Sequence, residues 1–313
     1  MLSLIIPVYR NEESLRDLLE AVEGLNAALE GKFEAVFVVD GSPDRCYEIL
    51  NKQLPEHSFQ AKLALLSRNF GSFAAIRAGL EIGDGEQFAV MAADLQEPPE
   101  LVLEMDNALR AGDVDVVVGV REGRMDPLLS RLPAEIFWGL YRRLVVPEVP
   151  PGGVDIFACN RDFRDQLLQM SEQHSSLIAQ IFWLGYRRKY ISYTRKERKH
   201  GKSAWTLRKK TNYLMDSVFS FTDLPIRLLI WAGGAAALLS GLFGLLVSLL
   251  RLSGLIGVTG YAPTVLIIIF FGSLNLFGLG IVGSYAWRTY ENTKARPLSV
   301  VLRSHQFNAT LKK

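Results

Sequence analysis

The sequence contains only two cysteines, Cys46 and Cys159, among its 313 residues. Two thiols cannot form the disulfide framework of a small secreted domain, and no Cys/His cluster has the spacing of a metal site. A net charge of +2 gives no basic excess for binding nucleic acid. These features favour a protein of a reducing compartment that does not bind nucleic acid.

The first residues lack the pattern of a secretory leader. Met1–Tyr9 carries no basic leader and only a short apolar run, so we interpret it as a buried strand. We therefore expect the amino-terminal domain to remain in the cytoplasm. The length allows one α/β domain of ~200 residues together with a smaller part.

Short apolar runs alternate with helical periodicity in the first half of the chain. Strands separated by helices predict a mostly parallel, Rossmann-like sheet that is covered on both faces. The predicted strands are Leu2–Val8, Ala35–Val39, Leu63–Leu66, Phe88–Ala92 and Val114–Val120, and the predicted helices include Glu13–Leu29 and Phe73–Leu80.

Polar side chains follow four successive predicted strands. Ligands of such sheets bind at the carboxyl ends of the strands, where loops that carry acidic and basic groups suit a nucleotide diphosphate and its cation. Each cluster taken alone is equally well explained as a turn, and the repetition at four strand ends favours a site. The clusters are Asp40, then Arg68 with Asn69, then Asp94 with Gln96, and finally Arg121.

Two long apolar segments occupy the last third of the chain. Ile226–Leu250 and Ala262–Trp287 each have ~25 mostly apolar residues, enough to cross a ~30 Å hydrocarbon core. Basic residues lie before the first segment and after the second, which predicts cytoplasmic locations for both ends. The alternative is a pair of buried helices in a soluble core.

Two further segments combine aromatic and basic residues. Trp205–Pro225 has the pattern of a helix that lies in the membrane interface. Ile136–Val146 fits that interpretation and fits equally well a helix that packs on its own sheet.

Six motifs are distinctive in their order and spacing: LIIPVYRNEESL, VVDGSPD, SRNFGS, ADLQEPPE, GVREGR and RKERKHGKS. They resemble the family 2 glycosyltransferases, and in particular the branch of dolichol-phosphate mannose synthases and polyprenyl-phosphate glucosyltransferases. The resemblance covers essentially the full chain. It implies a GT-A fold, a nucleotide-sugar donor, a divalent cation (Mg²⁺ or Mn²⁺) and inversion at the anomeric carbon.

The resemblance assigns roles to individual positions. It implies that Asp94, Asp155 and Arg198 are catalytic and that Asp94 and Gln96 bind the metal. It also implies that Arg121 and Arg131 face the phosphate of a substrate, and the acceptor is favoured over the donor as that substrate. The residues that it implies for the donor are Pro7, Tyr9, Glu12, Asp40, Arg68, Asn69, Gln96, Arg195 and Ser203. For Asp155, a helix cap or a salt bridge is an equally good explanation.

Two positions depart from the family pattern. Val39 precedes Asp40 where a second acid is usual, and Ala92 replaces the first acid of the Asp-x-Asp motif. One carboxylate can suffice when substrate phosphates supply the other ligands, but metal dependence is less secure than in a relative with both acids.

The sequence therefore predicts transfer of a hexose from a UDP- or GDP-sugar to undecaprenyl or dolichyl phosphate. A phosphate oxygen is already anionic, so the acceptor needs positioning rather than a general base. A non-catalytic sugar-nucleotide-binding subunit is the main alternative, and a polysaccharide synthase is disfavoured because a Gln-x-x-Arg-Trp motif is absent.

The predicted organisation places the protein in the cytoplasmic (inner) membrane with both termini in the cytoplasm. Residues 1–204 form the catalytic domain, 205–225 the interfacial segment, 226–288 a two-helix transmembrane hairpin and 289–313 a cytoplasmic tail. The resemblance also allows a homo-oligomer, for example a tetramer.

Overall fold

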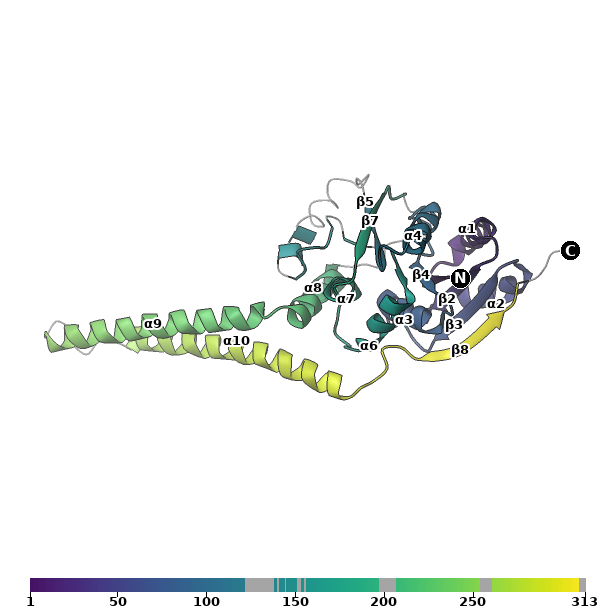
Figure 1. Cartoon of the computed structure of the whole chain (residues 1–313). Coiled ribbons are helices and arrows are strands. Elements are labelled where there is room, and N and C mark those ends of the chain that lie inside the picture. Colours follow the sequence, from purple (N-terminus) through teal and green to yellow (C-terminus); the bar gives the residue numbers. More distant parts are fainter. Residues whose placement is uncertain are drawn as a thin grey trace.

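The computed structural model describes residues 1–121, 138–139, 141–143, 145–150, 153–154, 156–196, 207–253 and 261–309. Within them, eight strands form one sheet in the order β7-β5-β6-β4-β1-β2-β3-β8 (Figure 1). The strands are β1 Leu2–Val8, β2 Phe33–Val39, β3 Gln60–Leu66, β4 Gln87–Val90, β5 Val116–Arg121, β6 Phe157–Asn160, β7 Arg188–Tyr193 and β8 Val301–Phe307.

The strand directions confirm the prediction of a mostly parallel sheet. β1 pairs in parallel with β2 and β4, β2 with β3, and β5 with β7. Among the strands that the structure describes, β6 and β8 alone run antiparallel to their neighbours. The carboxyl ends of β1 to β5 and β7 therefore lie along the same edge of the sheet.

Helices cover both faces of this sheet. The apolar side chains of α1 (Leu15–Ala28), α2 (Cys46–Gln53) and α4 (Glu100–Arg110) pack on one face. Those of α3 (Ser72–Ile82), α6 (Arg161–Gln169) and α7 (Leu177–Trp183) pack on the other. Alternate residues of β1 enter the two cores, since Leu4 and Ile6 face the first helix set and Ile5 faces the second.

Helix α8 (Leu207–Phe221) is fastened to the sheet domain by Tyr213. The Tyr213 ring is buried, stacks on the Tyr141 ring at 5.9 Å and shares a hydrogen-bonded hydroxyl cluster with Ser176. Tyr141 is itself fully buried, which favours the packing interpretation of the Ile136–Val146 stretch over the interfacial one. The interfacial location of Trp205–Pro225 remains a prediction.

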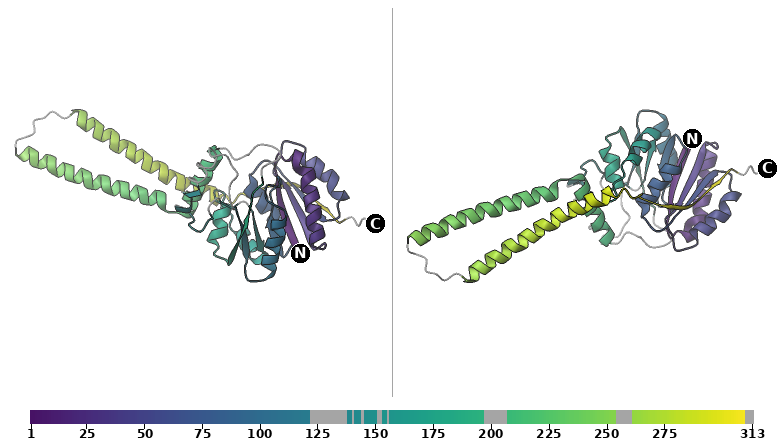
Figure 2. Two further views of the ribbon diagram at one scale, coloured as in Figure 1. Left: turned by 90° about the horizontal axis from the view of Figure 1, so that it is seen from above. Right: turned by 90° about the horizontal axis from the view of Figure 1, so that it is seen from below.

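Two long helices extend away from the sheet domain, α9 (Leu224–Leu252) and α10 (Tyr261–Thr293) (Figure 1). Figure 2 shows them diverging toward their far ends. Among the described residues, one segment, Leu224–Val247, is long and apolar enough to span a membrane, with a mean hydropathy of 1.9. The second predicted span, 262–287, lies in α10 but does not meet this criterion over the described residues, so a pair of spans is not confirmed.

Residues predicted as a tail return to the sheet. After α10 the chain runs back along the domain, and β8 pairs antiparallel with β3 from Leu66↔Val301 to Ala61↔Phe307 (Figure 1). The sequence predicts no strand in 289–313, because the exposed residues of β8 lack the apolar run of a buried strand. The start of β8 therefore lies beside the carboxyl end of β3, and the Ser67 backbone N just after β3 donates to the Val300 carbonyl at 2.9 Å.

Candidate active site

The loops that follow β1, β2 and β3 interlock at the carboxyl edge of the sheet. Asp40 follows β2 and is 2% exposed. Its Oδ1 accepts a hydrogen bond from the Phe70 backbone N (2.7 Å), and its Oδ2 accepts from Asn69 Nδ2 (3.0 Å) and the Gly71 backbone N (2.8 Å). Asp40 therefore organises the loop between β3 and α3, and its predicted contact with the donor stays a prediction.

Gly41 lets the same two loops approach closely. Its φ is +54°, and a Cβ at this position would lie 2.3 Å from the carbonyl carbon of Arg68 and 2.5 Å from the backbone N of Asn69. A glycine satisfies both constraints, because it adopts positive φ and leaves room for the neighbouring peptide.

The β1 and β2 loops are joined by a second set of polar contacts. Glu12 accepts hydrogen bonds from the Arg45 side chain (Nε, 2.9 Å) and backbone, and the Arg45 side chain is the main cause that lowers the Glu12 pKa. Asp44 accepts from Ser42 Oγ at 2.6 Å, and Ser42 Oγ in turn accepts from the Arg10 backbone N at 2.8 Å. These contacts fix the shape of the edge before any ligand binds.

Three more residues that are predicted to contact the nucleotide-sugar donor lie at this edge. Pro7 is in β1 opposite Val38, and half-buried Tyr9 follows β1 directly. Arg68 is exposed, and its guanidinium lies 4.2 Å from the centre of the Phe70 ring. The structure thus brings the predicted residues of the first three loops together.

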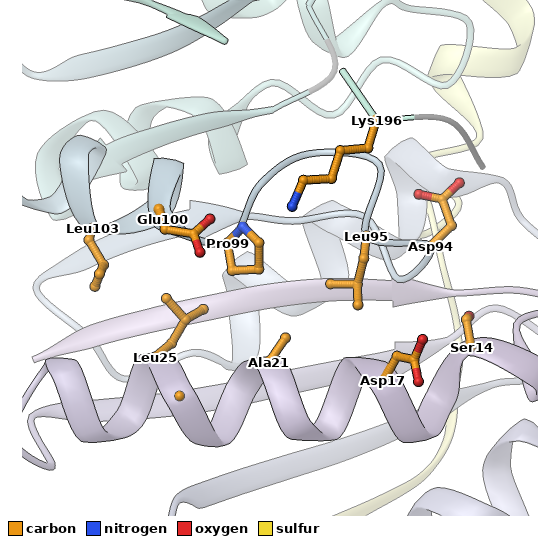
Figure 3. A pocket seen from close by; sticks show the side chains of 11 residues that line it. Ser14, Asp17, Ala21, Leu25, Asp94, Leu95, Pro99, Glu100, Leu103 and Lys196 are labelled. Atoms are coloured by element: carbon orange, nitrogen blue, oxygen red, sulfur yellow. The ribbon is translucent and has the colours of Figure 1, made fainter. Parts of the chain in front are cut away.

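Asp94 follows β4 and lines a groove of about 500 Å³. The groove runs between α1 and the start of α4, with Ser14 and Asp94 at one end and Leu25 and Leu103 at the other (Figure 3). The Asp94 carboxylate also accepts a hydrogen bond from the Gln96 backbone N at 3.3 Å.

The segment after β7 reaches the Asp94 turn. Arg195 Nη2 donates to Gln96 Oε1 at 2.6 Å. The Lys196 backbone N donates to the Gln96 carbonyl at 2.8 Å, and Lys196 also lines the groove of Asp94 (Figure 3). Two basic residues from the carboxyl end of β7 are therefore placed beside the acid that follows β4.

Sequence reasoning missed Glu97 and Lys196. Glu97 is 1% exposed and lies 3.8 Å from Arg195 (Oε1 to Nε). Charged side chains are rarely buried, so nothing in the sequence marks Glu97 except its position directly after Gln96.

Of the remaining predicted site residues, the structure describes only Arg121. Arg121 ends β5 and is in register with Tyr193 at the end of β7, so it lies at the same edge. The other four, Asp155, Arg131, Arg198 and Ser203, lie outside the described residues.

The metal-binding role of Asp94 and Gln96 stays a prediction. The described residues contain no group of three or more His, Cys, Asp or Glu side chains that could hold a metal ion. Gln96 Oε1 accepts a hydrogen bond from Arg195, and Asp94 lines the groove. A cation held by one carboxylate and by substrate phosphates agrees with this donor set.

Residues 3–191 match the model of the family described as glycosyl transferase family 2. The chain is 31% identical over 301 residues to an uncharacterized glycosyltransferase of Synechocystis sp., covering 96% of this chain and 94% of that protein. It is 33% identical over 301 residues to an undecaprenyl-phosphate 4-deoxy-4-formamido-L-arabinose transferase of Pseudomonas paraeruginosa (95% and 88%). It is 28% identical over 303 residues to a prophage bactoprenol glucosyl transferase homolog of Escherichia coli (96% and 98%).

The interlocked loops predict different outcomes for two glycine substitutions. Gly41→Ala and Gly31→Ala both place a side chain at positive φ, at a cost of roughly 1–2 kcal/mol. A Cβ at Gly31 has nothing within 4 Å, whereas one at Gly41 collides with the Arg68–Asn69 peptide. We expect Gly41→Ala to weaken binding of a nucleoside diphosphate about tenfold or more, and Gly31→Ala about twofold or less, by calorimetric titration. Equal effects on binding would contradict the interlocked edge.

Proposed function

The chain belongs to glycosyltransferase family 2, and from this premise we propose that it transfers a hexose from a nucleotide sugar to a polyprenyl phosphate. Its mostly parallel sheet is the GT-A-like α/β fold of that family. The observation that carries the proposal is the convergence of Asp94, Arg195 and Lys196 at the edge where the other strand loops meet. The products are a polyprenyl-phosphate sugar and a nucleoside diphosphate.

Charge stabilisation accounts for the donor half of the reaction. The leaving diphosphate gains negative charge as its bond to the sugar breaks, and fixed cationic groups lower the energy of that state. Arg195 has a defined place at the Asp94 turn, and Arg198 and Ser203 are proposed to act on the same diphosphate. A divalent cation at Asp94, Mg²⁺ or Mn²⁺, would neutralise part of the charge when bound.

Lipid chemistry accounts for the acceptor half. A polyprenyl phosphate attacks through an oxygen that is already ionised, so the site needs to orient it rather than deprotonate it. We propose that Arg121 and Arg131 bind the acceptor phosphate, and that Asp155 orients groups near the sugar. The relatives named for undecaprenyl phosphate and bactoprenol, together with the exposed apolar surface of α9, support a lipid acceptor.

The proposed location follows from the same features. We propose that α9 and α10 form a hairpin in the cytoplasmic membrane and that the sheet domain and both termini lie in the cytoplasm. The apolar residues of α9 from Leu228 to Leu249 are largely exposed, which water disfavours and a bilayer accommodates. Assembly into a tetramer stays a prediction.

The proposed reaction predicts that nucleoside diphosphate release depends on the lipid. The purified chain in detergent is incubated with undecaprenyl phosphate and a panel of UDP- and GDP-sugars, with and without Mg²⁺ or Mn²⁺. Release should require both the lipid and one particular donor, and Asp94→Ala should lower its rate on the order of 100-fold.

Asp84→Ala is the matched control for Asp94→Ala. Asp84 precedes β4 at the opposite edge of the sheet, where its exposed carboxylate pairs with Lys62, so release should stay within about twofold of the unmodified chain. Nucleotide binding without release from any donor would contradict the proposed transfer. Lipid-independent release would favour a polysaccharide synthase.

The proposed topology predicts the accessibility of two introduced cysteines. Burial raises the pKa of Cys46 to about 12 and raises that of Cys159 still further, so the native thiols should react little with a maleimide. In intact cells an impermeant maleimide should label Ser253→Cys, between α9 and α10, and should label Lys52→Cys in α2 only after permeabilisation. Labelling of Lys52→Cys in intact cells would contradict the cytoplasmic location of the sheet domain.

A further inference from the structure

Glu97 is a carboxylate taken almost completely out of water at the turn after β4. It is 1% exposed and directly follows Gln96, which accepts a hydrogen bond from Arg195. A buried carboxylate is costly unless a cation or hydrogen-bond donors compensate it. Its presence three positions after Asp94 therefore calls for a physical role.

Arg195 is a charged residue that lies beside Glu97. Arg195 Nε lies 3.8 Å from Glu97 Oε1, and Arg195 Nη2 lies 2.6 Å from Gln96 Oε1. The contact with Glu97 is an ionic one, longer than a hydrogen bond, and the contact with Gln96 is a hydrogen bond. A guanidinium is planar and has five N–H donors, so these two contacts favour one orientation and do not use all of its donors. The Arg195 side chain is 30% exposed, which leaves it accessible from the edge of the sheet.

The backbone around Arg195 is held without Glu97. The Lys196 backbone N donates to the Gln96 carbonyl at 2.8 Å, and Gln96 Nε2 donates to the Lys196 carbonyl at 3.4 Å. These two bonds already attach the segment after β7 to the Asp94 turn. The Glu97 carboxylate adds to this backbone attachment an ionic contact with the Arg195 guanidinium itself.

A second buried carboxylate in the same domain shows a different arrangement. Asp106 is also 1% exposed and pairs with Arg110 at 2.6 Å, one turn further along α4. That pair stays within a single helix. Glu97 instead joins the turn after β4 to the segment after β7.

We propose that Glu97 is a positioning residue for the transfer reaction, directing the Arg195 guanidinium toward the diphosphate that leaves the donor at Asp94. This inference rests on the proposed function. Because the charge on that diphosphate develops as the bond to the sugar breaks, a misdirected Arg195 affects the transition state more than the bound donor. The effect of losing Glu97 is therefore on kcat rather than on KM.

The test compares Glu97→Gln with Asp106→Asn in the full-length chain, using lipid-dependent release of nucleoside diphosphate. Each variant replaces a buried, arginine-paired carboxylate with its amide, so both should lower the melting temperature. We expect Glu97→Gln to lower kcat about tenfold or more with the donor KM changed less than about threefold, and Asp106→Asn to leave both within about twofold.

Two further variants separate positioning from folding. Glu97→Asp keeps the charge and should retain more than about a third of kcat, which keeps the proposal testable if Glu97→Gln does not fold. Arg195→Gln should lower kcat, and adding Glu97→Gln to it should lower kcat no further, because the two residues act through one guanidinium.

Failure of the positioning role of Glu97 and failure of the proposed function give different results. An unchanged kcat in Glu97→Gln, a loss in Glu97→Asp as large as that in Arg195→Gln, or additive losses in the double variant would overturn the positioning role. Absence of transfer by the unmodified chain would instead overturn the proposed function.

Discussion

The buried carboxylate of Asp40 holds the carboxyl edge of the sheet together. Its oxygens accept hydrogen bonds from Asn69, Phe70 and Gly71, so moving the loop after β3 away would break three hydrogen bonds to a carboxylate that is buried from water. Gly41 brings the two backbones into contact at the same point. The edge is thereby organised in advance of ligand binding, which lowers the entropy cost of holding a nucleotide there.

Polar contacts also connect this edge to the long helices. Helix α3 begins beside Asp40, and its buried Arg77 donates to the carbonyls of Leu167, Leu168 and Met170. A few residues on, the His174 carbonyl accepts from Arg288 of α10, whose guanidinium also binds Asp216 of α8 at 2.7 Å. In the proposed topology, this series of contacts would fix the distance between the site and the membrane surface.

Much of this architecture could be predicted from sequence, because the parallel strands are apolar runs with polar residues directly after them. The residues of β6, β7 and β8 escaped prediction for two reasons. β6 is buried but has only four residues, too few to show a period, and β7 and β8 have mixed or exposed side chains without the apolar run of a buried strand. The pairing of Gln96 and Glu97 with Arg195 was equally hidden. That contact depends on β7 lying beside β5, and a pairing between strands that are far apart in the chain leaves no pattern in the local sequence.

Hydrogen exchange of backbone amides, measured with and without a bound nucleoside diphosphate, tests most directly whether the loops form one site. If the loops form one site, bound nucleotide should slow exchange together in residues 9–14, 40–45, 68–72, 94–97 and 194–196. Exchange should stay unchanged at 83–86, at the opposite edge, where the backbone N–H groups of Asp84 and Gly85 donate to Glu34 and Ser3. Protection confined to one loop, or found mainly at 83–86, would contradict a single site.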